Sequence, residues 1–151
     1  MKKILVSACL LGVSCRYDGK SKPCGAVDAL KEKYQLIPIC PEVMGGLETP
    51  RIPSELKDGR AFRKDGTDIT EKCVKGANEA LRLAEKFGCK AAVLKERSPS
   101  CGSGSIYDGT FTGRVVSGDG IAAALLKMNG IKVFGESQLT ELEEFLKTEK
   151  L

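Results

Sequence analysis

Four short apolar runs, separated by segments with helical periodicity or by loops rich in glycine and proline, constrain the fold of this chain more than any other feature. Each run consists mainly of aliphatic and β-branched residues without a helical period, which is typical of strands buried on both faces of a parallel sheet. The predicted strands cover residues 4–9, 36–39, 89–94 and 131–134. Helical patterns cover residues 26–34, 68–87, 121–129 and a segment after 137. Asp119 is expected to cap the third of these helices.

The alternation of strands and helices predicts an α/β fold, namely a three-layer Rossmann/flavodoxin-like arrangement with a mostly parallel four-stranded sheet. The first strand, the first helix and the second strand form one right-handed βαβ unit, and we expect the strand order 2-1-3-4. The chain has the length of one domain, so we expect a single α/β domain over residues 1–151, without a repeat or a linker.

The loops also carry predictions. Residues 59–70 are expected to form a hairpin about the Asp-Gly pair at 65–66, and residues 106–111 a tight hairpin about the Asp-Gly pair at 108–109. The stretch 40–53 is too rich in proline and glycine for regular structure, and its length is typical of functional loops.

The composition restricts the chemistry and the cellular context. The chain has no histidine, so any acid–base or metal chemistry must use carboxylates, thiolates, hydroxyls, lysine or tyrosine. Seven cysteines without paired spacing point to a reducing compartment and to metal or redox use. The net charge of +4 is spread along the chain, so there is no strong nucleic-acid signal. Only residues 4–6 form an apolar run before Cys9, too short for a secretion signal, and no membrane span is found; we expect a cytoplasmic protein.

Three cysteines follow the predicted strands. Cys9 ends the first strand, Cys40 follows the second directly, and Cys101 follows the third after a short loop. Because the carboxyl ends of parallel strands share one edge and neighbouring strands lie about 4.8 Å apart, we expect these thiols to span a cluster-sized site. They could instead be buried structural thiols, but their Gly/Pro loops favour a metal site. Cys73 lies on an apolar helical face and Cys89 at the opposite strand end, so both are poor ligand candidates.

The ligand set favours an iron–sulfur cluster over zinc. Structural zinc usually takes four Cys or His ligands in close pairs, whereas this chain has no Cys-x-x-Cys, and Cys15 or Cys24 would have to supply a fourth. Three thiolates suit a 4Fe-4S cluster with one open iron, which is a Lewis acid for soft sulfur atoms.

Polar side chains near the thiols are candidates for the remaining roles. Glu42 lies two residues after Cys40 and is the candidate general base, although a solvated loop carboxylate fits the spacing equally well. Ser98 and Ser100, just before Cys101, could orient a substrate or donate to a developing charge, or only shape a turn. Weaker candidates for binding a polar substrate are Arg51, Asp18 and Lys95.

Three ordered motifs span nearly the whole chain: Ser7-Ala8-Cys9-Leu10-Leu11-Gly12 with Arg16-Tyr17-Asp18-Gly19, Cys40-Pro41-Glu42 with Gly45-Gly46-Leu47 and Pro50-Arg51, and Ser98-Pro99-Ser100-Cys101-Gly102. Together they resemble a small bacterial domain-of-unknown-function family whose characterised members are thiouracil desulfurases (TudS-like). The resemblance implies a 4Fe-4S cluster held by Cys9, Cys40 and Cys101, with an open iron for the thiocarbonyl sulfur. It also implies that Glu42 activates a water for hydrolysis without net redox, and it assigns the family's serine to Ser98, with Ser100 close by.

The leading hypothesis is therefore an iron–sulfur-dependent desulfidase that removes sulfur from thiouracil or a related thiolated pyrimidine by non-redox hydrolysis. The alternative from a different class is a non-catalytic metal- or sulfide-binding module in a thiolation pathway. A third hypothesis is a nucleotide-binding, flavodoxin-like domain whose thiols are incidental.

Overall fold

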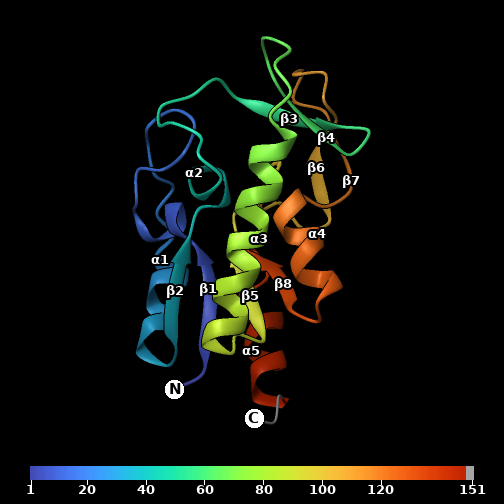
Figure 1. The fold of residues 1–151 in the computed structure, drawn as a ribbon. Helices are drawn as coiled ribbons and strands as arrows, with labels where there is room; N and C mark the ends of the chain where they lie inside the picture. The colour runs from blue at the N-terminus through green and yellow to red at the C-terminus, as the bar shows by residue number, and fades with distance from the viewer. Residues whose placement is uncertain (149–151) are drawn as a thin grey trace.

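A four-stranded parallel sheet forms the centre of the protein in the computed structural model, which describes residues 1–148 (Figure 1). Lys3–Ser7 of β1 pairs with β2 on one side and β5 on the other, all in parallel. The order β2-β1-β5-β8 corresponds to the predicted order 2-1-3-4, which is therefore confirmed. The remaining strands are β2 (Gln35–Ile39), β5 (Ala91–Leu94) and β8 (Lys132–Gly135).

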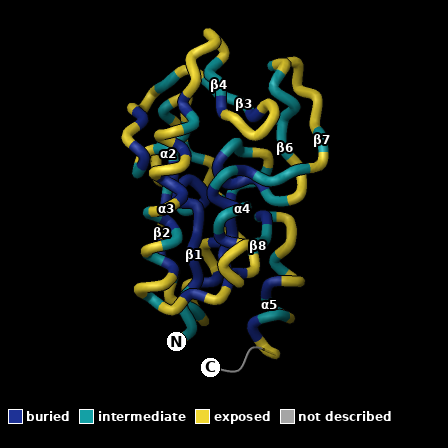
Figure 2. Tube along the Cα trace, turned by 45° about the vertical axis from the view of Figure 1, so that its right-hand side comes forward, coloured by how far each residue is buried: buried dark blue, intermediate teal, exposed yellow. Residues whose placement is uncertain are grey.

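Helices cover both faces of this sheet, which confirms the three-layer α/β fold (Figure 1). The helices α3 (Thr70–Phe87) and α4 (Ile121–Met128) pack on the face that contains Leu5 and Ala92. The opposite face, with Ile4 and Val6, is covered by α1 (Gly25–Asp28), the 3-10 turn Ala29–Glu32 and α5 (Leu139–Thr148). Successive strand residues point to opposite faces, and the central strands β1 and β5 are buried from both sides, as the dark β1 of Figure 2 shows. The edge strands β2 and β8 expose Pro38 and Lys132, so the prediction of burial on both faces is confirmed for the central strands and wrong for the edge strands.

The carboxyl edge of the sheet is covered by three small elements that are absent from a bare α/β core (Figure 1). They are the one-turn helix α2 (Pro41–Met44) and two antiparallel hairpins. The hairpins are β3 (Ser54–Lys57) with β4 (Arg60–Arg63), and β6 (Ser105–Tyr107) with β7 (Val115–Ser117). Within residues 1–148, no helix combines the length and the apolar character needed to cross a membrane.

The hairpin predicted about Asp65-Gly66 is present in part. An antiparallel bridge joins Phe62 to Asp68, and the N–H of Arg63 donates to the Thr67 carbonyl at 2.8 Å. The hairpin of β3 with β4 was not predicted; it turns at Asp58-Gly59, where both residues have positive φ (50° and 78°), as a type I′ turn requires. The prediction for residues 106–111 was wrong in detail, because residues 105–107 pair with 115–117 and the expected tight turn at 108–109 is the start of a longer loop. Asp-Gly pairs therefore indicated turns correctly, but strand pairing depended on neighbouring apolar residues that the dipeptide does not encode.

The predictions for one helix, one loop and one helix cap also need correction. The helix expected over 26–34 is α1 followed by a 3-10 turn, because apolar residues three apart fit a 3-10 turn as well as an α-helix. Residues 40–53 are not entirely irregular, since Pro41 occupies the first turn of α2, where its missing N–H costs nothing. Asp119 does not cap α4; its carboxylate accepts the Gly104 N–H at 2.8 Å and pairs with Lys127 Nζ, also at 2.8 Å.

The contact between α2 and α3 depends on two glycines that let the backbones approach closely. A Cβ on Gly76 would lie 1.7 Å from the Pro41 carbonyl oxygen, and a Cβ on Gly45 would lie 1.9 Å from the Lys72 carbonyl oxygen. Neither oxygen belongs to a flexible side chain, so a methyl group would force the two helices apart. This contact fixes α2, and with it the residues that follow β2, at the edge of the sheet.

We expect Gly76→Ala to destabilise the protein by roughly 1–3 kcal/mol, because overpacking outweighs the gain of about 1 kcal/mol in helix propensity. Chemical denaturation measures this change. Gly25→Ala is the matched control, because a Cβ there meets no atom within 4 Å. A Gly76→Ala variant as stable as the wild type would show that the two helices separate without cost.

Candidate metal centre and active site

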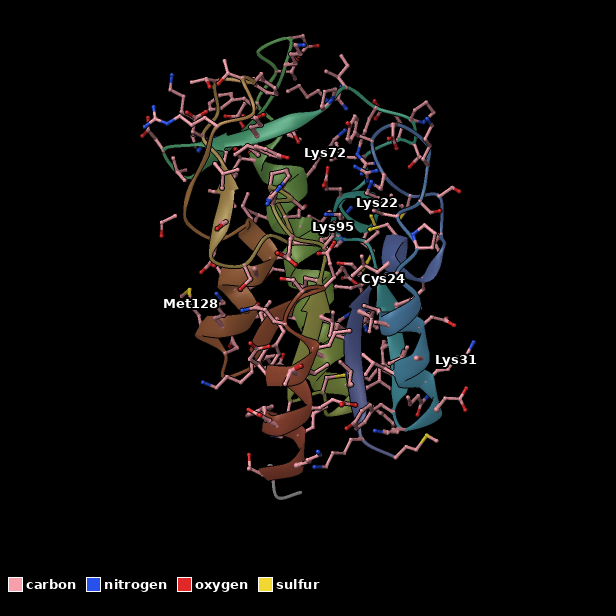
Figure 3. The ribbon with its side chains drawn as sticks, turned by 180° about the vertical axis from the view of Figure 1, so that it is seen from behind. Lys22, Cys24, Lys31, Lys72, Lys95 and Met128 are labelled. Carbon is pink, nitrogen blue, oxygen red and sulfur yellow. The ribbon has the colours of Figure 1, made fainter. Side chains whose placement is uncertain are left out.

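A large cavity opens at the carboxyl edge of the sheet, between the strand ends and the two hairpins. Its volume is about 620 Å³, within the range of small-molecule sites. Residues after β1, β2 and β5 line one side, and residues of β3 and of the β6–β7 hairpin line the other. In Figure 3, Lys22 and Lys95 lie in this region, whereas Met128 lies away from it on α4. This is the edge at which α/β sheets bind ligands.

Two of the predicted thiols reach the cavity from adjacent strand ends. The strand β1 ends at Ser7, so Cys9 lies not in the strand but in the 3-10 turn Ala8–Leu11 that follows it. This turn closes at Gly12, whose φ of 95° suits glycine, and the chain therefore leaves the sheet earlier than predicted. Cys40 follows β2 directly with extended backbone angles and precedes the first residue of α2. Both side chains line the cavity.

The third thiol is held by a turn that a serine organises. The hydroxyl oxygen of Ser98 accepts the N–H groups of Ser100 and Cys101, both at 3.1 Å. Ser98 and Cys101 line the cavity with Cys9 and Cys40, although Cys101 itself is only 5% exposed. Three cysteines distant in sequence therefore line one cavity, and their role as ligands of one cluster stays a prediction.

The ionisation of the thiols reflects this proximity. The pKa of Cys101 is raised to about 12, chiefly by burial and also by charge on Cys40, although the hydroxyls of Ser7 and Ser98 oppose the shift. The pKa of Cys9 is lowered, chiefly by a hydrogen bond from Cys15, against the effects of burial and of charge on Cys101 and Cys40. The pKa of Cys40 is raised, chiefly because it is hydrogen-bonded to Cys15, and secondly by burial.

Cys15 therefore lies between two of the predicted ligands. It is 8% exposed, lines the cavity, and its carbonyl oxygen accepts a hydrogen bond from Cys40 Sγ at 3.8 Å. Cys24 is half-buried and does not line the cavity. Of the two cysteines considered as a fourth ligand, only Cys15 is placed at the site.

The predicted general base is also at the cavity, where it has a buried cationic partner. Glu42 is the second residue of α2, and its Oε1 lies 3.3 Å from Nε of Arg51. The two side chains are only 15% and 3% exposed. Arg51 also donates from Nη1 to the Glu48 carbonyl at 3.1 Å and to Thr49 Oγ1 at 3.2 Å. Arg51 also lines the cavity, so substrate binding by Arg51 stays a prediction, and its contact with Glu42 gives it a role in orienting that carboxylate.

We expect Arg51→Lys to lower kcat about tenfold and to leave KM and iron content nearly unchanged. Lysine keeps the positive charge beside Glu42 but loses the planar fork that fixes the carboxylate, and misplacement of a catalytic group lowers kcat. Steady-state kinetics on reconstituted protein measure both constants. A raised KM with an unchanged kcat would instead support the original expectation that Arg51 binds the substrate.

The other predicted substrate-binding residues are placed differently. Lys95 lines the cavity, but its Nζ lies 3.1 Å from Glu136 Oε2 and donates to the Glu96 carbonyl. Asp18 does not line the cavity and pairs with Arg16 at 3.6 Å. Ser100 is fully buried, lies outside the cavity lining and makes no hydrogen bond from its hydroxyl within the described residues. The structure thus brings Lys95 to the site, and it does not bring Asp18 or Ser100 there.

Ser7, Glu55 and Phe111 are among the residues at the site that sequence reasoning missed. Ser7 is 2% exposed, accepts the Lys95 N–H at 2.8 Å and influences Cys101. The position of Ser7, two residues before the predicted ligand Cys9, could have identified it as a site residue. Glu55 and Phe111 line the cavity from the two hairpins. No sequence pattern connects these last two, because the pairing of their hairpins was not predicted.

The donor set fits an iron–sulfur cluster. Three thiols from three loops line a cavity that has space for a substrate, and thiolate sulfur is the ligand that iron–sulfur clusters require. Among residues 1–148, no three His, Cys, Asp or Glu side chains are placed as ligands of a single metal ion. Fold and site together define an α/β protein with a thiol-lined ligand site at the carboxyl edge of its sheet.

Comparison with known proteins identifies the family. A sequence profile of the 2-thiouracil desulfurase family matches residues 4–138, and the chain belongs to this family. The chain is 40% identical over 149 residues to the uncharacterized protein YbbK of Bacillus subtilis, covering 92% of this chain and 99% of that protein. A solved structure of the [4Fe-4S]-dependent thiouracil desulfidase TudS superposes with a TM-score of 0.94 at 46% identity, covering 99% of this chain and 100% of that one.

Proposed function

We propose that this chain is a [4Fe-4S]-dependent desulfidase that converts thiouracil or a related thiolated pyrimidine into the corresponding oxygen compound. The observation that carries the proposal is the cavity itself, where Cys9, Cys40 and Cys101 meet the carboxylate of Glu42. Membership of the 2-thiouracil desulfurase family and the similarity to TudS support the substrate class and the cofactor.

The residues of the chain have distinct roles in this proposal. Cys9, Cys40 and Cys101 hold the cluster, which supplies a Lewis-acidic iron with a free position for a soft sulfur atom. Glu42 takes a proton from the attacking water, and Arg51 keeps its carboxylate aimed at the cavity. Ser98 orients the substrate and fixes the turn that carries Cys101.

The overall reaction is a hydrolysis in which no electrons are gained or lost. Water adds its oxygen to the thiocarbonyl carbon, the carbon–sulfur bond breaks, and the products are the carbonyl compound and hydrogen sulfide. Glu42 accepts one proton of the water, and that proton can return to the departing sulfide. No external oxidant or reductant is required.

We further propose that residues 1–151 act as a single desulfurase domain in the cytoplasm. All seven cysteines are free thiols, as is usual in a reducing compartment. The last three residues lie outside the described part of the chain.

Anaerobic reconstitution tests the proposal. Protein purified and reconstituted without oxygen should show about four irons per chain, as expected for one 4Fe-4S cluster. It should convert 2-thiouracil to uracil with release of one sulfide per uracil. A complete cluster without turnover of any thiolated pyrimidine would favour the non-catalytic sulfide-binding module. Protein that takes up no iron would contradict the proposed desulfidase.

A further inference from the structure

The loop between β6 and β7 is anchored to the other hairpin, on the same side of the cavity. A single carboxylate oxygen, Glu55 Oε1 on β3, accepts the N–H of Gly109 at 3.0 Å and the N–H of Phe111 at 3.1 Å. Gly109 approaches β3 so closely that a Cβ there would lie 2.8 Å from the Leu56 carbonyl oxygen. The loop tip is therefore tied to β3 rather than extended into solvent.

The anchored loop places an aromatic residue in an unfavourable backbone conformation. Phe111 has a φ of 58°, in the left-handed region that bulky residues rarely adopt. Internal hydrogen bonds stabilise the same loop, because Asp108 Oδ1 accepts the Thr110 N–H at 2.9 Å and its hydroxyl at 2.6 Å. Such conformations persist where the surroundings enforce them, and they concentrate at ligand sites.

Phe111 lines the same cavity as the three thiols and Glu42. Tyr107, on the adjacent strand β6, lines the same cavity. Phe111 is half-buried, so part of its side chain remains accessible to a ligand. An aromatic side chain in this position can stack on a planar heteroaromatic ring, an interaction that tolerates any base because each has a π face.

We propose that Phe111 is a specificity-determining residue, which stacks on the pyrimidine ring of the substrate, and that Glu55 is the positioning residue that holds it there. This inference rests on the proposed desulfidase function and specifies its substrate class as planar heteroaromatic thiocarbonyl compounds. Phe111 contributes to binding of the ring and leaves the bond-breaking step to the residues on the opposite side of the cavity.

Kinetics of Phe111 variants test this inference. Phe111→Leu keeps the size and the unfavourable φ but removes the π face, so KM for 2-thiouracil should rise about tenfold with kcat changed less than about twofold. The inhibition constant of uracil, which has the same ring without the sulfur, should rise equally. Phe111→Tyr should behave like the wild type. Unchanged KM and uracil inhibition in Phe111→Leu would overturn the inference.

Two further variants separate ring recognition from a structural role. Phe111→Gly removes the ring and accepts the positive φ, so it should stay folded and lose affinity as Phe111→Leu does, even if the leucine variant folds poorly. Val115→Ala, on the exposed side of the same hairpin, should change neither constant. If Phe111→Gly lowers kcat without changing KM, the ring has no role in binding.

Binding measurements distinguish failure of this inference from failure of the proposed function. Calorimetric titration of the reconstituted wild type and of Phe111→Leu with uracil requires no turnover. Weaker uracil binding by the variant would support ring stacking even if the wild type proved inactive on 2-thiouracil. Equal affinity, or no uracil binding by the wild type, would contradict it.

Discussion

Replacement of Cys9, Cys40 or Cys101 by serine, one at a time, is expected to remove most of the bound iron and to reduce thiouracil turnover to background. Serine is nearly the same size as cysteine, but its hydroxyl is a poor ligand for iron at neutral pH. Removal of a hydrogen-bond partner of a metal ligand lowers metal affinity by roughly 10–100-fold. Removal of a ligand itself should lower it more. Iron content and the visible spectrum of protein purified without oxygen measure the first effect, and uracil formation measures the second.

The other cysteines provide matched controls within the same chain. Cys89 is 4% exposed but lies at the opposite end of the sheet, and Cys24 is half-buried outside the cavity lining. Serine at either position should leave iron content unchanged. The Cys15→Ser variant tests whether Cys15 is a ligand or only a neighbour of the ligands. We expect this variant to hold a full cluster. Normal iron content in any one of the three ligand variants would remove that residue from the proposed ligand set.

The second large effect is expected from Glu42→Gln, which should retain a full cluster and lower kcat by roughly 10²–10⁴. Glutamine keeps the shape of the side chain and an oxygen that can accept the Arg51 hydrogen bond, but it cannot take a proton from water. Because Glu42 belongs to α2 and not to the predicted ligand set, iron content and the spectrum should match those of the wild type. Single-turnover formation of uracil from 2-thiouracil measures the loss directly.

Glu48→Gln is the appropriate control for this substitution. Glu48 lies six residues further along the same segment and pairs with Arg63 at 2.9 Å, but its side chain is 59% exposed and does not line the cavity. The Glu48→Gln variant should therefore retain wild-type turnover of 2-thiouracil. If Glu42→Gln is fully active, another group accepts the proton from water, and the proposed role of Arg51 as a positioning residue fails with it.

Much of the fold and the thiol site could be predicted because both follow from local pattern combined with a general rule. The short apolar runs indicated strands of a parallel sheet, and Cys40 directly follows β2, so the parallel topology alone brings it to the ligand-binding edge. The error at Cys9, which lies in a turn rather than in a strand, did not matter. The direction of the chain at the strand end, not its exact last residue, decides where that thiol lies.

The polar partners around the thiols could not be predicted in the same way. The ion pair between Lys95 and Glu136 joins two different strand ends, and the hydrogen bonds from Gly109 and Phe111 to Glu55 join two hairpins. Each depends on the path of a loop and on side-chain rotation, which apolar periodicity does not encode. Ser98 and Ser100 illustrate the limit, because they are two residues apart and only one lines the cavity.

The sequence by itself therefore determined the α/β class, the strand order and the convergence of three thiols with Glu42, because strand burial and parallel direction leave few alternatives for residues at strand ends. Only the tertiary structure decided that Arg51 pairs with Glu42, that Ser100 is buried outside the cavity lining, and that Phe111 lines the cavity. These outcomes depend on contacts between segments that are distant in the chain. Such contacts are determined by the folded paths of the loops, which local sequence patterns do not encode.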